Sequence, residues 1–180
     1  MNTGRRLNPC HLSKASCEMM ASVLQSAPSH LRELDMSDND LQDEGVELLC
    51  AGLRDPQCKL ETLRLSGCLI THEGCSLLSS ALKSNPSYLK QLDLSYNHPG
   101  DSGVRELTDR LNDPSCKLET LSLNQCHLSK ASCEMMASVL QRTPSHLREL
   151  DMSDNDLQDE GVKLLCVGLR KPQCKLETLS

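Results

Sequence analysis

The chain has 180 residues, of which 38% are hydrophobic and 24% are charged, and this composition is ordinary for a globular protein of one domain. Its formal net charge of −6 argues against a nucleic-acid-binding protein, which needs clustered Lys and Arg side chains to replace counterions on phosphates, and favours a basic partner if there is one. The sequence contains no apolar run of about 18 residues and no charged-then-apolar N-terminus, so it predicts neither a membrane span nor a secretory signal.

Aromatic residues are almost absent. Phe and Trp do not occur, and Tyr88 and Tyr96 are the only tyrosines. A core must therefore be built from Leu, Val, Met, Ala and Cys. Small, regularly spaced apolar side chains suit stacked repeats, in which each layer buries its apolar face on the next layer.

An eleven-residue motif recurs along the chain in steps of 29 residues. The complete copies are LRELDMSDNDL from Leu31, LETLRLSGCLI from Leu60, LKQLDLSYNHP from Leu89, LETLSLNQCHL from Leu118 and LRELDMSDNDL again from Leu147. They follow the leucine-rich repeat signature L-x-x-L-x-L-x-x-N/C-x-L. The motif predicts an α/β solenoid, a horseshoe with a parallel β-sheet on its concave face and helices on its convex face, because strands stack about 4.8 Å apart whereas helices need roughly 10 Å.

The period divides the chain into units. We expect one leucine-rich repeat domain fragment, made of a partial repeat, five full repeats and the start of another: 1–30, 31–59, 60–88, 89–117, 118–146, 147–175 and 176–180. Neither end has the polar capping repeat that solenoids normally carry. We therefore expect Leu7 at one end, and Leu176 and Leu179 at the other, to expose apolar edges that allow self-association.

Each motif is followed by a helical pattern with apolar residues at i, i+3, i+4 and i+7. Such stripes are Cys17, Met20, Ala21 and Leu24; Val46, Leu49, Cys50 and Leu53; and Val162, Leu165, Cys166 and Leu169. The predicted N-caps are Ser13, Asp43, Thr71, Asp101, Ser129 and Asp159. The residues that end the helices are Pro28, Pro56, Pro86, Pro114, Pro144 and Pro172.

The ninth motif position alternates between two residue types. Repeats of the Asn type carry Asn39, Asn97 and Asn155, and repeats of the Cys type carry Cys10, Cys68 and Cys126. We expect the Asn side chains to turn inward and satisfy backbone groups where each strand ends. Most of the eleven cysteines recur with a spacing of 58 residues, which favours buried thiols over disulfides and hence a reducing, cytoplasmic environment.

Two distant segments are nearly identical. Residues 10–64 match residues 126–180 at 49 of 55 positions, and four of the six differences alter charge. This pattern indicates recent duplication of repeat pairs, with change tolerated mainly on the surface.

The third, fifth and seventh motif positions should face outward on the concave sheet, because side chains alternate along a strand. With the charged and aromatic residues that follow, they give these candidate partner-binding residues: Glu33, Asp35, Asp38, Arg64, Gln91, Asp93, Tyr96, Glu149, Asp151 and Asp154. A ladder of short acidic and hydroxyl side chains could receive a Lys/Arg-rich protein surface. The same residues are equally explained as the solvated face of a solenoid.

The residues suited to chemistry recur with the period, whereas a catalytic constellation must be singular. His11, His98 and His127 share the tenth motif position, and the last two should lie on neighbouring strands, but zinc would need two more convergent ligands. We therefore expect no catalytic residues, no metal site and no cofactor. The phosphate-binding motif G-x-x-x-x-G-K-[ST] does not occur.

The phrase NDLQDEGVELLCAGLRDPQCKLETLRLSGC, with the alternation of Cys and Asn, closely resembles the repeats of ribonuclease inhibitor and of the leucine-rich domains of NACHT-type NOD-like receptors. The likeness extends from about Leu7 to the end. Near-duplicate repeat pairs are most similar to the expanded receptor families of fish. This resemblance implies a cytoplasmic recognition or regulatory module of innate immunity that is not an enzyme. The alternatives are a ribonuclease-inhibitor-like protein that blocks a basic enzyme, and an enzyme-activating repeat protein such as a GTPase activator, which would require a distinctive exposed Arg that the sequence does not single out.

Overall fold

A computed structural model describes residues 4–6, 12, 14–26, 30–86, 88–141 and 145–180. Short strands and helices alternate along the chain. The strands are β1 (Gly4–Arg6), β2 (Glu33–Asp35), β3 (Thr62–Arg64), β4 (Gln91–Asp93), β5 (Thr120–Ser122), β6 (Glu149–Asp151) and β7 (Thr178–Leu179). The helices are α1 (Lys14–Gln25), α2 (Gln42–Leu53), α3 (His72–Ser84), α4 (Gly100–Leu111), α5 (Lys130–Leu140) and α6 (Gln158–Leu169).

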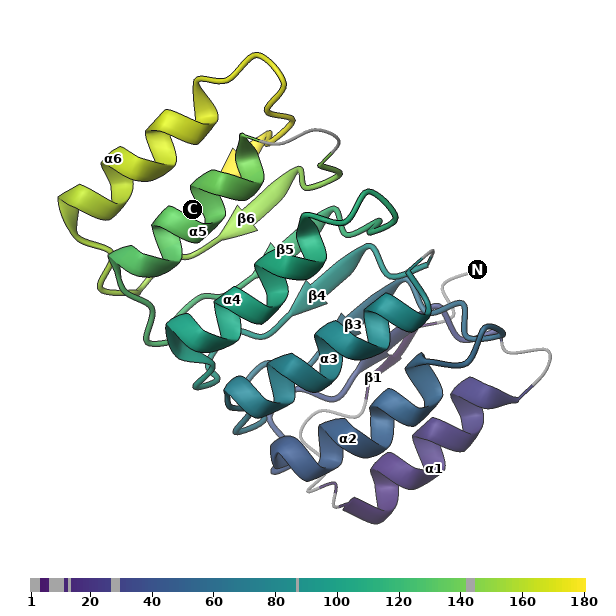
Figure 1. Cartoon of the computed structure of the whole chain (residues 1–180). Helices are drawn as coiled ribbons and strands as arrows, with labels where there is room; N and C mark the ends of the chain where they lie inside the picture. Colours follow the sequence, from purple (N-terminus) through teal and green to yellow (C-terminus); the bar gives the residue numbers. More distant parts are fainter. Residues whose placement is uncertain (1–3, 7–11, 13, 27–29, 87, 142–144) are drawn as a thin grey trace.

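The strands form one parallel sheet in the order β1-β2-β3-β4-β5-β6-β7. Each residue pairs with the residue 29 positions further on, as Leu34 does with Leu63 and Leu63 with Leu92. The helices lie side by side in a second layer on one face of this sheet (Figure 1). The chain is therefore the predicted α/β leucine-rich repeat solenoid. We call the sheet side the inner face and the helix side the outer face, and a strand with its following turn a rung.

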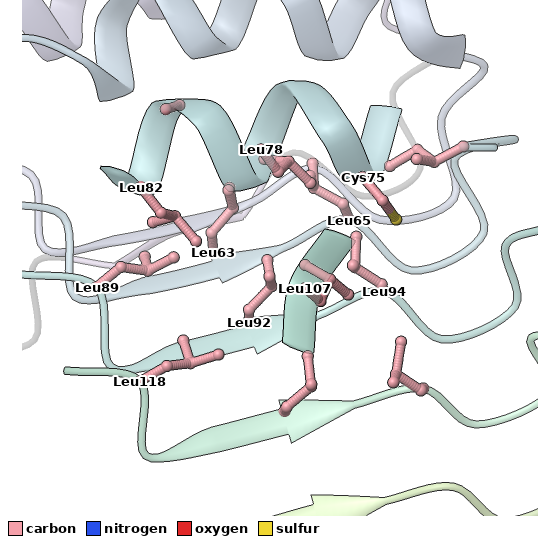
Figure 2. Close-up of a cluster of buried hydrophobic side chains, with 14 of the residues drawn as sticks. Leu63, Leu65, Cys75, Leu78, Leu82, Leu89, Leu92, Leu94, Leu107 and Leu118 are labelled. Carbon is pink, nitrogen blue, oxygen red and sulfur yellow. The ribbon is translucent and has the colours of Figure 1, made fainter. Parts of the chain in front are cut away.

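The core lies between the two layers. The central residue of each strand from β2 to β6 is buried, as are helical residues such as Leu78 and Val104. Figure 2 shows Leu63 and Leu92 of the sheet together with Leu78 and Leu82 of α3 in one cluster. As the composition predicted, this core consists almost wholly of Leu, Val, Met, Ala and Cys.

The predicted stripe on α2 is buried in full, but that on α6 is not: Val46 is 0% exposed, whereas its equivalent Val162 is 50% exposed. The difference arises because α2 packs between α1 and α3, whereas among the described elements α6 packs against the helix α5 alone. None of the described helices combines the length and apolar character that crossing a membrane requires.

The helix N-caps follow the prediction in the Cys-type repeats. The hydroxyls of Thr71 and Ser129 accept hydrogen bonds from the N–H groups of Glu73 and Ala131, at 3.2 Å each. Pro56, Pro86, Pro114 and Pro172 follow the ends of their helices, as expected. Ser13, Pro28 and Pro144 lie outside the described residues.

The N-cap prediction is wrong in the Asn-type repeats, where Asp43, Asp101 and Asp159 lie inside the first helical turn. Asp43 instead accepts hydrogen bonds from the N–H groups of Thr71 and Gly74, at 2.9 and 3.0 Å, so it caps the next helix, α3. Asp101 likewise accepts hydrogen bonds from the N–H group of Ser129 at 3.0 Å and from its hydroxyl at 2.6 Å, at the start of α5. These carboxylates join neighbouring repeats.

Candidate functional site

The inner face is built from the side chains that flank the buried leucine of each strand. Parallel register places equivalent residues of neighbouring strands side by side. The third-position row reads Glu33, Thr62, Gln91, Thr120 and Glu149, and the fifth-position row reads Asp35, Arg64, Asp93, Ser122 and Asp151. These two rows hold five acidic side chains and one basic side chain, so β2 to β6 present an acidic surface.

The exposure of these residues varies along the face. Gln91 and Glu149 are exposed, and Glu33, Arg64 and Ser122 are partly exposed. Arg64 and Asp93 also line a small depression on the inner face that extends over β3, β4 and β5. A partner that reached the sheet would meet the acidic side chains beside this depression.

Several positions that were expected to face solvent are buried. Thr62, Ser37, Ser95 and Asn124 are each at most 9% exposed. Thr62 donates to the side-chain oxygen of Gln91 at 3.2 Å, and the Asn124 amide donates to atoms of the next rung. Contacts with the neighbouring rung therefore bury some of the polar side chains that strand alternation had predicted to be available for binding.

The fifth-position aspartates have a structural role as well. The carboxylates of Asp35, Asp93 and Asp151 each accept a hydrogen bond, at 2.9 to 3.1 Å, from the N–H group two residues further on. Such contacts fix the turn that follows the strand. Each of these carboxylates thus stabilises its own turn while its charge remains on the inner face.

The remaining candidates, Asp38, Tyr96 and Asp154, lie on the turns where the strands end. All three are exposed and have positive φ angles of 57°, 59° and 54°. Gly67 has a φ of 63° at the equivalent place after β3, so the repeat itself imposes the left-handed conformation. Tyr96 is 54% exposed at this position.

His98 and His127 lie on neighbouring rungs with ring centroids 4.8 Å apart in an edge-to-face arrangement. This agrees with the spacing expected from the period. Within the described part of the chain, no three His, Cys, Asp or Glu side chains are placed to hold a metal ion. His11 lies outside the described residues.

The structure adds an ion-pair ladder at the starts of the strands that the motif reading missed. Glu61 lies 3.7 Å from Arg32 and 2.8 Å from Lys90, and Arg148 pairs with Glu177. The second motif position alternates in sign along the whole ladder: Arg32, Glu61, Lys90, Glu119, Arg148 and Glu177. This alternation in the sequence could have revealed the ion-pair ladder. Asn-type repeats contribute the basic side chains and Cys-type repeats the acidic ones.

A second, basic group lies beside this ladder. The Lys117 ammonium lies 3.2 Å from Nε2 of His146. Burial, followed by the charges of Lys117 and Lys175, lowers the pKa of His146. This edge of the sheet therefore differs in charge from the acidic inner face.

The ends of the described chain meet the apolar-edge expectation only partly. Leu179 is 38% exposed, but Leu176 is partly buried and packs against the core. Leu7 lies outside the described residues. Self-association through the ends stays a prediction.

The chain matches the family model described as Leucine Rich repeat over residues 27–50, 57–79, 85–107 and 143–166. NACHT, LRR and PYD domains-containing protein 12 from Homo sapiens is 49% identical over 174 residues, which are 97% of this chain and 16% of that protein. The protein of the same name from Mus musculus is 46% identical over 96% of this chain and 16% of its own length. Ribonuclease inhibitor from Sus scrofa is 44% identical over 96% of this chain and 37% of its own length. The chain thus spans less than two fifths of these relatives.

Proposed function

The chain belongs to the leucine-rich repeat family, and we propose that it is a non-catalytic module that recognises another protein through the inner face of its sheet. One observation carries this proposal. Five strands in strict register hold five acidic side chains and one basic side chain on a single surface. Such a surface attracts a Lys/Arg-rich protein and orients it on approach.

We further propose that this module works in the cytoplasm as part of an innate immune receptor of the NACHT type. The similarity to NACHT, LRR and PYD domains-containing protein 12 over 97% of this chain supports this assignment. The ten described cysteines are all free thiols, which is typical of a reducing compartment. The alternative is an inhibitor that covers a basic enzyme, which the similarity to ribonuclease inhibitor supports.

Titration with a pancreatic-type ribonuclease, used as a basic protein probe, tests the proposed basic partner and distinguishes it from the inhibitor alternative. A recognition module with an acidic inner face should bind this enzyme weakly and in a salt-dependent manner, with the enzyme's activity retained. Stoichiometric inhibition would instead favour the inhibitor. No binding at low salt would contradict the proposed basic partner.

Charge variants locate the contact. The triple variant Asp35→Asn, Asp93→Asn, Asp151→Asn keeps a side-chain oxygen for each turn N–H and removes three charges, so it should weaken binding at least tenfold without unfolding the protein. Arg64→Ser copies the residue found at Ser122 and should strengthen binding. The control is the outer-face variant Glu44→Gln, Glu73→Gln, Glu134→Gln, which removes three exposed charges from the helices. Equal effects from the inner-face and outer-face triple variants would contradict an inner-face site.

A further inference from the structure

Exposed apolar and imidazole side chains gather on the turns after β3, β4 and β5. Leu69 is 46% exposed and Tyr96 is 54% exposed. His98 and His127 are also exposed and lie in contact. We call these four residues the exit ridge, because they lie where the strands leave the sheet.

Backbone hydrogen bonds hold the rungs of the exit ridge together. The N–H group of His98 donates to the carbonyl of Ile70 at 2.8 Å, and Thr71 and His98 form a parallel bridge. The N–H group of Tyr96 donates to the carbonyl of Asn124 at 2.8 Å. Leu69 therefore lies on the rung beside His98, and Tyr96 on the rung beside His127.

The backbone on the exit ridge is unfavourable for its side chains. Leu69 and Tyr96 each have a φ angle of 59°, in the left-handed region that disfavours bulky side chains, and His127 has a φ angle of 57°. At the turn position of Tyr96, other rungs carry Asp38, Gly67, Gln125 and Asp154, and of these the two Asp residues and Gly67 suit this conformation better. Tyr96 thus occupies a strained backbone position, and its side chain is not buried, so packing does not offset the strain as it would for a structural residue.

Acidic residues flank the exit ridge on both sides. Asp38 and Asp40 are exposed on the turn after β2, and Asp154 and Asp156 are exposed on the turn after β6. Four strand spacings separate the two pairs, which is about 19 Å. An extended polypeptide covers about this distance with six residues.

We propose that the exit ridge is a docking surface for an extended protein segment that carries apolar side chains between basic side chains. The apolar centre of the segment contacts Leu69, Tyr96 and the two imidazole rings. Its basic ends reach the aspartate pairs on the flanking turns. This inference shares with the proposed function a basic protein partner and the candidate residues Asp38, Tyr96 and Asp154, but it places the apolar contact at the edge of the sheet.

The test is the binding of a labelled peptide, measured by fluorescence anisotropy. The probe is fluorescein-Lys-Arg-Ser-Phe-Leu-Ser-Arg-Lys-amide, and the control peptide has Ser-Ser in place of Phe-Leu. The exit ridge should bind the probe at least tenfold more tightly than the control peptide. Equal affinities, or no binding of the probe, would overturn the proposal.

Two variants separate binding from folding. Tyr96→Asp installs the residue found at Asp38 and Asp154, and Leu69→Asn installs a residue that tolerates a positive φ. Each should weaken probe binding at least tenfold while leaving Tm equal to or above that of the unaltered protein. Retained affinity in the double variant would refute the exit ridge.

The inner-face triple variant of Asp35, Asp93 and Asp151 distinguishes the two proposals. Loss of ribonuclease binding in that variant, with probe binding kept, supports separate surfaces. If probe binding is lost in the Asp93→Asn single variant but kept in Tyr96→Asp, the exit ridge is refuted and the inner face stands. Sedimentation that shows association of the unaltered chain but not of Tyr96→Asp would assign the ridge to a second copy and overturn the peptide assignment.

Discussion

Asn97 joins two repeats through one buried side chain. Its carbonyl oxygen accepts hydrogen bonds from the N–H groups of Cys68 and Ile70, both at 2.9 Å. Its amide group donates to the carbonyl oxygens of Leu65, Leu94 and Ser95, at 2.7 to 3.2 Å. The side chain is 0% exposed, so water does not replace these contacts.

Asn97→Ala should lower the free energy of unfolding by about 3 kcal/mol or more, because two buried N–H groups lose their acceptor and each costs about 1 to 3 kcal/mol. Urea denaturation followed by circular dichroism measures the loss. Gln125→Ala, at an exposed position of the next turn, is the control and should change stability by less than about 0.5 kcal/mol. A loss below about 1 kcal/mol for Asn97→Ala would show that the turn rearranges to satisfy its own backbone.

The inward orientation of the ninth-position asparagines could be predicted from the sequence, because a polar residue that recurs inside an apolar motif must form hydrogen bonds with buried backbone groups. The role of Asp35 and Asp93 in their own turns could not be predicted in this way. The period shows which residues share a position, but not which backbone N–H group points at a given carboxylate. Thr62 and Asn124 illustrate the same limit, since burial by the neighbouring rung depends on side-chain size in both rungs.

Among the elements, the helices are joined by carboxylates that cap the following helix. A good capping residue near a helix start is visible in the sequence. The helix that it caps, however, is set by the stacking of the repeats, and Asp43 and Thr71 are 28 residues apart. Asp43 therefore caps the helix of the next repeat and not its own helix, so the stability of neighbouring helices is coupled.

Helix spacing also depends on pairs that only the structure brings together. A Cβ atom at Gly52 would lie 2.9 Å from the backbone of Ala21, so α1 and α2 approach too closely for any side chain there. The equivalent position on α4 holds Arg110, which lines a polar groove with Ser79 of α3. The guanidinium of Arg110 is buried and lies 2.8 Å from the carboxylate of Asp113. The sequence shows Arg110 where Gly52 and Gly168 recur, but the period does not give the groove that Arg110 lines.

The cap between repeats makes stability depend on pH through Asp101. Burial alone would raise the pKa of Asp101, but hydrogen bonds from Ser129 and Ser132 outweigh burial and lower the pKa below its ordinary value. A carboxyl with a lowered pKa in the folded state adds stability above its unfolded pKa of about 3.9, and this stability is lost as the pH falls through the folded pKa.

Asp101→Asn should therefore cost about 1 kcal/mol at pH 7, the typical value of a helix cap. The difference from the unaltered protein should shrink below about pH 4. Denaturation curves between pH 2.5 and 7 for both proteins measure this difference. Asp109→Asn, an exposed change on the same helix, provides the control, and a difference for Asp101→Asn that stays constant with pH would contradict the assigned cap.

At the scale of the whole molecule, the fold followed from the period, because each strand and helix recurs every 29 residues and stacked layers bury their apolar faces. The candidate site followed only in outline. The inner-face rows could be predicted from strand alternation, whereas the exposed Leu69 could not, because the tenth motif position carries no constant side chain. The neighbouring repeats carry Asp40 and His98 at the same motif position. The apolar side chain of Leu69 between them was the only indication of this site in the sequence.

The near-duplicate segments provide a matched comparison between the inside and the end of the described stack. Cys50 on α2 and Cys166 on α6 occupy equivalent places in almost the same sequence. Cys50 is buried, whereas Cys166 is partly exposed, because α2 packs between two described helices and α6 packs against one. Cys58 and Cys174 differ in the same way.

Thiol labelling should therefore separate residues that the sequence makes equivalent. Burial raises the pKa of Cys50 to about 12, so at pH 8 this thiol carries almost no reactive thiolate and is also inaccessible. Iodoacetamide at pH 8 should modify Cys166 and Cys174 at least tenfold faster than Cys50 and Cys58. Mass spectrometry can distinguish the peptides because Glu47 and Asp55 correspond to Lys163 and Lys171. In denaturing urea all four rates should become equal, and equal rates in the native protein would mean that the repeats open independently of their position in the stack.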